Sequence, residues 1–370
     1  MDHFREHYPE WTVFDATSQK KEDKRAYEYG FWMNYRNSNK VVPSIIVINY
    51  DLIWRRPELK ELKDFTLMLD ESSLIQNENS KRSKFILKLN PTNVILLSGT
   101  PCGGKYELLW SQMHLLGWKI SKSMYWDQYV RSHYEDVNGF PLKIVDGYKN
   151  VGRLKRKMRE HGCLFLKTEE VMDLPDQVFQ KVYVPVTTAY KKFMRDRIIT
   201  VDDRELVGDT TLTKLLYARM LCGLYSKEKL EAFRDLIMST DDRVIVFYNF
   251  TEEVIRLVEV VEETDRGMSF VNGFGRSMYA YEECSDSVTF VQYQSGSMGL
   301  NLQKACRIIY FTPPLSSELY EQSKKRIHRI GQKSTCFYYN LICKGSVEEK
   351  IYEVLKQRKD YTEALFEFDQ

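Results

Sequence analysis

The sequence predicts an α/β fold built on parallel sheets, and three observations support this prediction. Short apolar runs rich in β-branched residues occur at 43–50, 65–69 and 93–97, as expected for strands buried on both faces. A segment with helical apolar spacing, residues 80–89, lies between two of them. A second series of such strands begins after residue 240. At 370 residues the chain is long enough for two domains, each with its own core.

The first domain is predicted to span residues 1–175. Its second strand ends on an Asp-Glu pair at 70–71, and its third strand ends on the small and hydroxyl residues 98–100. Function in open α/β sheets sits at the carboxyl ends of the strands, so both groups are predicted to lie at a site. Residues 106–170 are predicted to be mainly helical, with a turn at 138–141.

The second domain is predicted to span residues 176–370, because Pro175 breaks the preceding pattern and a new strand follows it. Helices and four further strands then indicate a second α/β sheet. The predicted strands are 180–186, 243–248, 287–293, 307–311 and 336–341, and the predicted helices are 188–196 and 211–238.

The composition is that of an ordinary globular protein without a strong global charge. The 54 Lys and Arg residues nearly cancel the 52 Asp and Glu residues, so a nucleic-acid surface must be a local patch. No apolar run approaches the ~20 residues of a membrane helix, and the first residues lack the apolar core of a signal peptide. The seven cysteines form no C-x-x-C pair, so we expect reduced, unmetallated thiols and an intracellular, cytoplasmic location.

Asp70 and Glu71 provide the first chemical signal. At the end of a buried strand, one carboxylate can hold Mg²⁺ while the other orients an attacking water. The alternative is a helix N-terminus stabilised by acidic residues, which is common. The hydroxyls of Ser98 and Thr100 are a weaker signal, because a simple strand-to-loop turn also explains them. Residues 295–302 either offer backbone amides to a phosphate or form a flexible loop.

A basic segment near the carboxyl end, residues 321–332, is predicted to be a helix that stops at Gly331. Gln322, Arg326 and Arg329 are spaced four and three apart, so a helix would place them on one face. Two guanidiniums on one face suit the charge that develops on a transferring phosphoryl group. A solvated basic helix end is the alternative.

In this order, these segments resemble the Swi/Snf-type helicase-like ATPases of helicase superfamily two. Residues 70–73 match the family's Walker B box, and residues 97–101 match its third motif. Residues 295–302, with the strand that runs into 310–314, match the fifth motif and its sequel. Residues 326–332 match the sixth motif, which is the most specific match of all.

Two further segments extend the resemblance over nearly the whole chain. Residues 48–51 resemble the strand end that precedes Walker B, and residues 167–175 resemble the bridge between the lobes. The short bridge and the lack of large insertions are similar to compact phage or bacterial members of the family.

The resemblance implies two RecA-like lobes with parallel sheets that close on ATP and step along double-stranded DNA. It implies that Asp70 holds Mg²⁺ and that Glu71 activates water. It implies that Arg326 and Arg329 are arginine fingers, which are typically worth ~10³–10⁵ in rate. The same resemblance assigns cofactor binding to Gly299, Asn301 and Gln332, and coupling to the nucleic acid to Ser98, Gly99, Thr100, Lys105 and Ser295.

Two departures from the family pattern change the expected activity. The Walker A loop, G-x-x-x-x-G-K-[ST], does not occur in residues 1–69, and residues 99–106 fit it only until Tyr106. The first lobe is therefore predicted to be N-terminally truncated, with ATP hydrolysed poorly unless a separate polypeptide supplies the missing segment. Ser72 and Ser73 stand where many relatives carry Ala-His or Gly-His, so coupling between the lobes is expected to use a different hydrogen bond.

Three functions remain open from the sequence. A DNA-dependent ATPase that translocates on double-stranded DNA is the leading interpretation, and a non-catalytic DNA- or protein-binding remnant of such an ATPase is the second. A strand-separating helicase is the third. Basic clusters are either DNA contacts, which would weaken with salt, or solvated helix faces. These clusters are Lys81, Arg82 and Lys84, and Arg153, Lys155, Arg156, Lys157 and Arg159.

Overall fold

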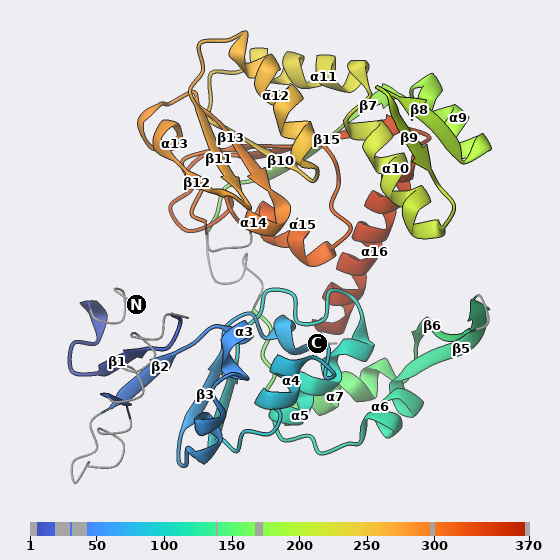
Figure 1. The fold of residues 1–370 in the computed structure, drawn as a ribbon. Coiled ribbons are helices and arrows are strands. Elements are labelled where there is room, and N and C mark those ends of the chain that lie inside the picture. The colour runs from blue at the N-terminus through green and yellow to red at the C-terminus, as the bar shows by residue number, and fades with distance from the viewer. Residues whose placement is uncertain are drawn as a thin grey trace. The chain divides into compact units, whose positions relative to one another are not determined.

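Each part of the computed structural model combines strands with flanking helices (Figure 1), so the predicted α/β class is confirmed. The chain divides into two compact units, one formed by residues 1–102 and 106–163 and the other by residues 103–105 and 164–370. The structure describes residues 6–18, 30–31, 43–137, 140–166, 173–296 and 300–366.

Two parallel strand pairs are described in residues 1–102 of the first unit, with short helices between the strands. β1 (Thr12–Asp15) pairs with β2 (Ser44–Val47), and β3 (Thr66–Leu69) pairs with β4 (Asn93–Leu96). The three strands predicted for this part of the chain are confirmed, with ends that differ by a few residues. β1 was not predicted.

The helix predicted at 80–89 is α4 (Lys81–Ile86). The Ser80 hydroxyl caps it by accepting a hydrogen bond from the backbone N–H of Ser83 at 3.2 Å. Phe85 is buried in the same core as Leu69 of β3, which holds the helix against the strand pair. The other helical segments of this unit are α3 (Tyr50–Ile53), α5 (Trp110–Leu115), α6 (Lys122–Tyr129) and α7 (Val151–Glu160), with short 3-10 turns at Pro57–Glu61, Ser72–Ile75 and Tyr106–Leu109.

The prediction that residues 106–170 are mainly helical is wrong for one antiparallel hairpin, formed by β5 (Val130–Val137) and β6 (Phe140–Tyr148). Figure 1 shows this hairpin extending away from the helices of its unit. Val137 pairs with Phe140. Residues 138–139, the first half of the predicted turn, lie outside the described residues. An Asn-Gly dipeptide at these positions is a strong hairpin signal that the helical prediction overlooked.

A seven-stranded sheet forms the centre of the second unit, with the strand order β12-β11-β13-β10-β14-β15-β7. Neighbouring strands are parallel except for β11 and β12. The strands are β7 (Gln177–Pro185), β10 (Val244–Tyr248), β11 (Met268–Asn272), β12 (Gly275–Ser277), β13 (Val288–Gln292), β14 (Arg307–Tyr310) and β15 (Cys336–Lys344). All five predicted strands are confirmed. β11 and β12 were not predicted, because the run is short and glycines interrupt it.

The central strand β10 shows why its sequence is continuously apolar: all five residues are buried. Val246 belongs to the core formed with α11 (Lys227–Met238) and α12 (Thr251–Glu262) on one face. Phe247 belongs to the core on the other face, where its ring lies 5.1 Å from that of Tyr293. The short helices α13 (Tyr279–Glu283), α14 (Tyr293–Gly296) and α15 (Ser317–Lys324) contribute to that second core.

A smaller cluster lies beside the β7 end of the sheet (Figure 1). Its elements are α9 (Thr188–Asp196), β8 (Ile198–Val201), β9 (Arg204–Val207) and α10 (Thr211–Gly223), and the last helix of the chain is α16 (Val347–Phe366). The helix predicted at 188–196 is confirmed. The segment 211–238 is two helices, α10 and α11, because Ser226 starts a new helix by accepting a hydrogen bond from the N–H of Lys229 at 3.2 Å.

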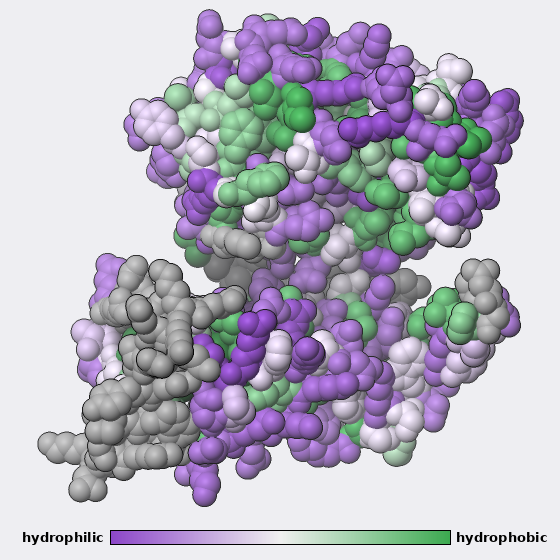
Figure 2. All heavy atoms as spheres, in the orientation of Figure 1, coloured by the Kyte–Doolittle hydropathy of each residue, from purple (hydrophilic) through white to green (hydrophobic). Residues whose placement is uncertain are grey.

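The surface mixes hydrophilic areas with smaller hydrophobic ones on the face shown in Figure 2. Scattered apolar side chains are normal on globular proteins. Among the described residues, no helix has both the length and the apolarity needed to cross a bilayer.

Candidate functional site

The acid pair lies directly after β3, in a turn that leaves Asp70 exposed and Glu71 partly buried. Glu71 has a φ of +53°, in the left-handed region that non-glycine residues rarely adopt outside functional or tightly held turns. The Tyr50 hydroxyl donates a hydrogen bond to the backbone carbonyl of Asp70 at 2.7 Å. Burial raises the pKa of Tyr50 and the two carboxylates add to this effect, so the phenol stays a hydrogen-bond donor.

The segment after the acid pair argues against the helix-cap alternative, and the magnesium site stays a prediction. An exposed carboxylate such as Asp70 is an oxygen ligand of the kind that Mg²⁺ prefers, and water can complete the coordination there. The segment that follows is only a four-residue 3-10 turn, and Glu71 makes no side-chain capping bond to it. The helix N-terminus therefore explains little about this pair.

The third-motif turn lies beside the acid pair. β3 and β4 are parallel, and backbone hydrogen bonds continue past their ends, from the N–H of Leu97 to the carbonyl of Leu69 (2.9 Å) and from the N–H of Ser72 to the carbonyl of Leu97 (2.8 Å). Within the turn, the Ser98 hydroxyl accepts the N–H of Thr100 at 3.2 Å. The structure thus brings together the two predicted strand ends of this unit.

Two glutamines that sequence reasoning missed fasten these turns to each other. The Ser72 hydroxyl donates to the side-chain oxygen of Gln112 at 2.8 Å, and the Gln112 amide donates to the carbonyl of Pro101 at 2.5 Å. The Gln76 amide donates to the same carbonyl at 2.9 Å. Ser72 departs from the family pattern, and that departure was the only sequence signal for this network.

The basic residues after Walker B are partly engaged inside their own unit. The ammonium of Lys81 lies 4.6 Å from the centre of the Trp54 ring, and the guanidinium of Arg82 pairs with Asp51 at 3.1 Å. Lys84 is exposed. Lys81 and Arg82 therefore have structural roles in addition to any contact with DNA.

Helix α7 presents basic residues to solvent because Leu154 and Met158 occupy its buried face. Exposed cations of this kind suit DNA phosphates and suit a solvated helix face equally well. The exposed basic residues of this helix are Arg153, Arg156 and Arg159, and Lys105, outside the helix, is also exposed.

The predicted helix of the sixth motif ends earlier than expected. α15 stops at Lys324, and Arg326 and Arg329 lie in the turns that follow. The prediction of a helix ending at Gly331, with Gln322 and both arginines on one face, is therefore wrong.

The physical reason is that the carbonyls needed to continue the helix bind other partners. The carbonyl of Arg326 accepts the N–H of Leu302 at 3.0 Å, and the carbonyl of Ile327 accepts the side-chain amide of Gln332 at 3.2 Å. Gly331 then adopts a φ of +94°, which suits a turn and which glycine adopts without strain. Tertiary hydrogen bonds outweigh the local helical pattern here.

Two predicted site residues meet in this unit. The Arg329 guanidinium donates a hydrogen bond to the side-chain oxygen of Asn301 and lies 3.5 Å from the carbonyl of Leu300. Ser295 lies in α14 and is partly buried, whereas Gly299 lies outside the described residues. The end of the fifth motif and the sixth motif are thus adjacent.

Gln332 is buried, and its side chain holds the backbone around it. Its amide donates to the carbonyls of Ala305 (2.8 Å), Gln303 (3.2 Å) and Ile327 (3.2 Å), and its oxygen accepts the next two backbone N–H groups at 3.0 Å each. These bonds fasten the loop before β14 to the sixth motif. Its contact with a cofactor stays a prediction.

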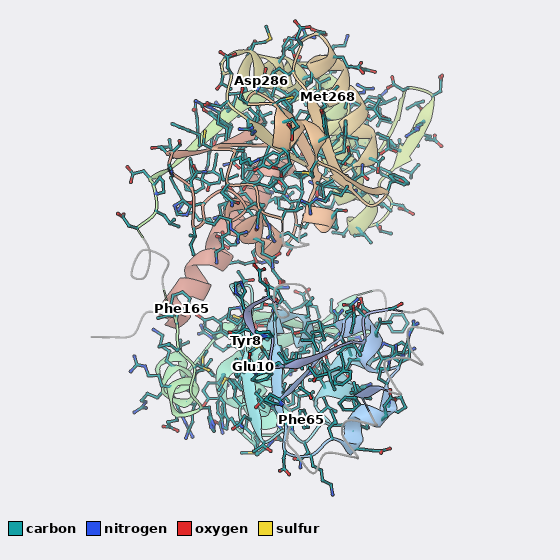
Figure 3. The ribbon with its side chains drawn as sticks, turned by 90° about the vertical axis from the view of Figure 1, so that its left-hand side faces the viewer. Tyr8, Glu10, Phe65, Phe165, Met268 and Asp286 are labelled. Carbon is teal, nitrogen blue, oxygen red and sulfur yellow. The ribbon has the colours of Figure 1, made fainter. Side chains whose placement is uncertain are left out.

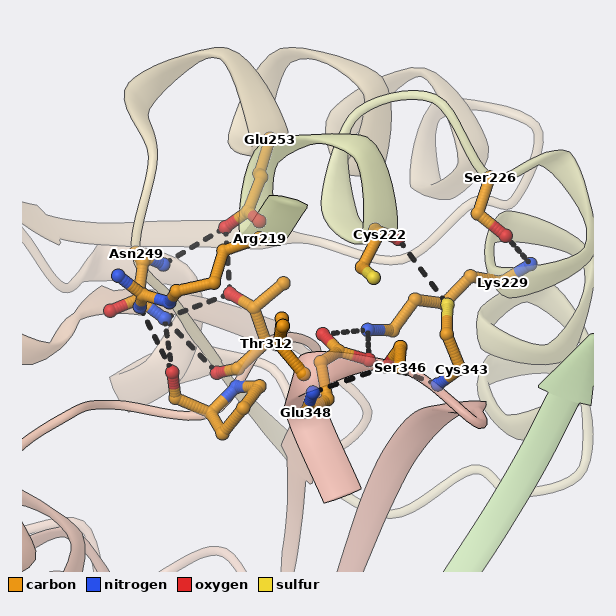
Figure 4. Close-up of polar contacts among 12 residues, drawn as sticks. Arg219, Cys222, Ser226, Lys229, Asn249, Glu253, Thr312, Cys343, Ser346 and Glu348 are labelled. Atoms are coloured by element: carbon orange, nitrogen blue, oxygen red, sulfur yellow. Dashed lines mark hydrogen bonds and ion pairs between the residues drawn. The ribbon is translucent and has the colours of Figure 1, made fainter. Parts of the chain in front are cut away.

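The fifth motif begins after β13, at the carboxyl edge of the seven-stranded sheet, whereas the sixth motif directly precedes β15. Figure 3 labels Met268 and Asp286, which mark the opposite, amino-terminal edge at the starts of β11 and β13. At the carboxyl edge, Glu253 joins the loop after β10 to the loop after β14 (Figure 4). Sites in such sheets lie at this edge, so the contacts of Glu253 affect how the site is built.

Glu253 is 1% exposed, and one of its oxygens accepts the N–H groups of Asn249 (2.9 Å) and Phe250 (3.1 Å) and the hydroxyl of Thr312 (3.0 Å). The Asn249 amide also donates to the hydroxyl of Thr312 at 2.9 Å and to the carbonyl of Pro313 at 3.0 Å. Burial raises the pKa of Glu253 to about 7, although the backbone hydrogen bonds oppose the rise. An acidic residue at a capping position after a strand was the signal that sequence reasoning missed.

A buried cluster of Cys222, Cys343 and Glu348 has ligand atoms within 4.8 Å of one another, as a metal site would. Figure 4 shows what occupies it: the Lys229 ammonium lies 2.6 and 2.8 Å from the two oxygens of Glu348. Glu348 also accepts the N–H of Cys343 at 2.9 Å. The ammonium already neutralises the carboxylate, so the geometry describes a buried ion pair and not a metal site.

Two family models match the chain. Residues 1–228 match the SNF2-related domain, and residues 228–331 match the helicase conserved C-terminal domain. The protein belongs to the SNF2-related family. This agrees with the motif order and with the α/β fold of both units.

The relatives of this SNF2-family chain come from bacteria and from animals, and the bacterial ones are named as ATP-dependent helicases. The putative ATP-dependent helicase/translocase YwqA of Bacillus subtilis is 23% identical over 374 residues, which cover 91% of this chain and 39% of the relative. An uncharacterized ATP-dependent helicase of Mycoplasma genitalium is 21% identical, over 96% of this chain and 35% of the relative. The human DNA repair and recombination protein RAD54-like is 23% identical, over 90% of this chain and 51% of the relative.

This chain therefore spans between a third and about half of the length of these relatives. They are cellular proteins, and the predicted phage origin stays a prediction. A solved structure, the C-terminal part of the Fun30 ATPase domain, is 16% identical over 52% of this chain with a TM-score of 0.37, which is too low to support a conclusion.

Proposed function

We propose that this chain provides catalytic residues of an ATP-dependent translocase on double-stranded DNA that uses Mg²⁺, and that full activity needs a Walker A segment, which residues 1–370 do not contain. One observation carries the proposal: in a member of the SNF2-related family, the residues on either side of the acid pair, Leu69 and Ser72, are hydrogen-bonded to Leu97 of the third motif at adjacent strand ends. Because the two strand ends are joined, a nucleotide bound at the acid-pair turn can change the position of the third-motif turn.

The residues have distinct roles in this proposal. Asp70 would hold Mg²⁺, which supplies positive charge to the ATP phosphates when it is bound. Glu71, held in a left-handed turn, would orient the attacking water. Arg326 and Arg329 would stabilise the charge that develops on the transferred phosphoryl group, and Asn301 would orient Arg329 through their hydrogen bond.

An apolar face in the first unit supports the packing of a further segment against β3 and β4. Met68 of β3 is 56% exposed and lies opposite Ile95 of β4, which is 41% exposed, and Leu97 on the same face is 47% exposed. Strands that are buried on one face only and expose large apolar residues on the other are typical of a sheet that another segment covers. A strand–loop–helix segment carrying the Walker A sequence would cover such a face and supply the phosphate-binding lysine.

ATP hydrolysis by the purified chain, with and without duplex DNA, tests the proposal. We expect little activity from the chain alone and DNA-stimulated activity when a polypeptide carrying G-x-x-x-x-G-K-[ST] is added. Glu71→Gln should abolish that activity, and Met68→Asp should prevent the added polypeptide from binding. Leu142→Asp is the matched control, because Leu142 is 52% exposed on the separate hairpin. Robust DNA-stimulated hydrolysis by residues 1–370 alone, abolished by Glu71→Gln, would refute the need for an added Walker A segment.

The second candidate is a non-catalytic DNA- or protein-binding remnant, and the lack of a Walker A sequence in residues 1–69 favours it. It predicts salt-sensitive binding to duplex DNA with no ATP hydrolysis under any of the conditions above. A strand-displacement assay on the reconstituted enzyme separates translocation from strand separation.

A further inference from the structure

The second unit contains a hollow of about 720 Å³ that none of the family motifs lines. Three segments form it: the end of β7, one face of α9 and the turn from β15 into α16. Its floor is apolar and consists of Pro185, Val186, Tyr190 and Met194. A hollow of this size is within the range of binding sites in proteins, which is ~300–1,000 Å³.

The rim of the hollow is basic. Lys191, Arg195 and Lys344 line it, and no carboxylate does so among the described residues. Arg195 binds the neighbouring Asp196 at 2.6 and 2.9 Å, which reduces its charge toward a ligand. The two lysines are exposed and dominate the charge of the rim.

The walls of the hollow are held in place by hydrogen bonds. The Tyr190 hydroxyl accepts the N–H of Val347 at 2.9 Å, which joins α9 to the start of α16. Gly345 has a φ of +78°, which glycine adopts easily, and its N–H donates to Glu349 at 3.0 Å. A ligand therefore meets a site that is already formed, which lowers the entropic cost of binding.

We propose that this hollow binds an acidic, extended peptide segment of a partner protein that carries apolar anchor side chains. Lys191 of α9 and Lys344 at the end of β15 lie on different segments of the rim, so carboxylates at more than one position of the peptide can pair with them. Large apolar side chains would cover the floor.

Charge complementarity alone would also admit a nucleic acid, but the floor disfavours that ligand. A phosphate backbone would use the rim cations and would leave Tyr190 and Met194 in contact with water. An acidic peptide with Leu or Phe anchors uses both parts of the site, because anchors bury apolar area while carboxylates neutralise the rim. This inference does not depend on ATP hydrolysis or on DNA binding by the rest of the chain.

Fluorescence anisotropy with a labelled peptide tests the proposal. The probe is a dodecapeptide in which Asp and Glu alternate with Leu and Phe, and the full chain is the receptor. We expect saturable binding that weakens about tenfold or more in Lys191→Glu/Lys344→Glu, since both rim charges reverse. We also expect weak binding of a second peptide in which Ser replaces Leu and Phe.

Lys192→Glu/Lys350→Glu is the matched control, because it makes the same charge change at exposed positions of α9 and α16 that do not line the hollow. It should change the affinity by less than about twofold. A photo-crosslinking version of the peptide should attach to Tyr190 or Met194 of the unsubstituted chain, which tests the site even if a variant folds poorly. Lack of saturable binding, equal loss in both double variants, or crosslinks elsewhere would overturn the proposal. Binding of a short DNA duplex that depends on Lys191 and Lys344, without binding of the peptide, would also overturn the proposal.

Discussion

Replacing Lys229 with methionine tests whether the buried ion pair holds the second unit together. Both side chains of the pair are 0% exposed, and the Lys229 ammonium lies 2.6 and 2.8 Å from the two oxygens of Glu348. Burial alone would lower the pKa of Lys229, but the Glu348 carboxylate outweighs it and the pKa is raised. Lys229→Met keeps most of the buried apolar stem and removes the charge.

The expected loss of stability follows from the carboxylate that remains. Removing one partner of a buried pair typically costs ~3–5 kcal/mol, because the other charge is left uncompensated. Glu348 keeps only the N–H of Cys343, at 2.9 Å, as a partner among those described. For a unit of roughly 200 residues, such a loss lowers Tm by about 10 °C.

Thermal unfolding of Lys229→Met, Glu348→Gln and the double variant measures this effect. The double variant should recover most of the loss, because glutamine still accepts the N–H of Cys343 and no charge remains buried. Lys304→Met is the control, since Lys304 and its partner Glu282 are half exposed and the pair should contribute no more than ~1 kcal/mol. A loss below ~1 kcal/mol in Lys229→Met, or a double variant as unstable as the sum of the single ones, would refute the reasoning.

Three further predictions concern the turns and loops of the two units. Folding raises the pKa of Glu253 from 4.5 to about 7, so the stability that this carboxyl contributes is complete below pH ~4.5 and is lost as the pH rises through 7. The total loss is ~3 kcal/mol. Between pH 5 and 8, Tm should therefore fall more in the unsubstituted chain than in Glu253→Gln. Ser72→Ala removes the donor to Gln112 and should lower the stability of the first unit by ~1–3 kcal/mol in denaturant unfolding. In the reconstituted ATPase, Arg329→Ala should lower kcat by ~10³ or more in steady-state assays, whereas Asn301→Ala should lower it less.

Each of these predictions has an outcome that contradicts it. Parallel pH profiles for the unsubstituted chain and Glu253→Gln would show that the carboxyl does not titrate as described. Ser72→Thr retains a hydroxyl and is the control for Ser72→Ala, so equal losses in the two would argue against the hydrogen bond. An unchanged kcat in Arg329→Ala would exclude that guanidinium from the reaction.

Much of the fold follows from local sequence patterns. The apolar runs around Ile46, Leu67 and Val246 predicted strands correctly, but of these only β10 is buried on both faces, whereas β3 buries alternate residues. The positions of Asp70 and of Ser98 at one edge also followed, because parallel strands place their carboxyl ends together. These predictions required only the spacing of apolar residues along the chain and the rule that sites in parallel α/β sheets lie at the carboxyl ends of the strands.

The errors share a different cause. Arg326 and Arg329 were placed on a helix because their spacing suits one, but Leu302 and Gln332 take the carbonyls that the helix would need. The β5–β6 hairpin has no apolar alternation of a half-buried sheet, since both of its faces are largely exposed. In both places, local periodicity did not decide the structure.

The sequence by itself determined the α/β class, the strand ends that carry Asp70, Glu71 and the third motif, and membership of the SNF2-related family, because these depend on residue order and on short-range periodicity. Only the tertiary structure decided that Gln112 joins two turns, that Glu253 joins two loops, and that Lys229 pairs with Glu348. Lys229 and Glu348 are 119 positions apart in the chain. Their pairing arises when folding removes both from water, and a buried charge then remains stable only beside its opposite.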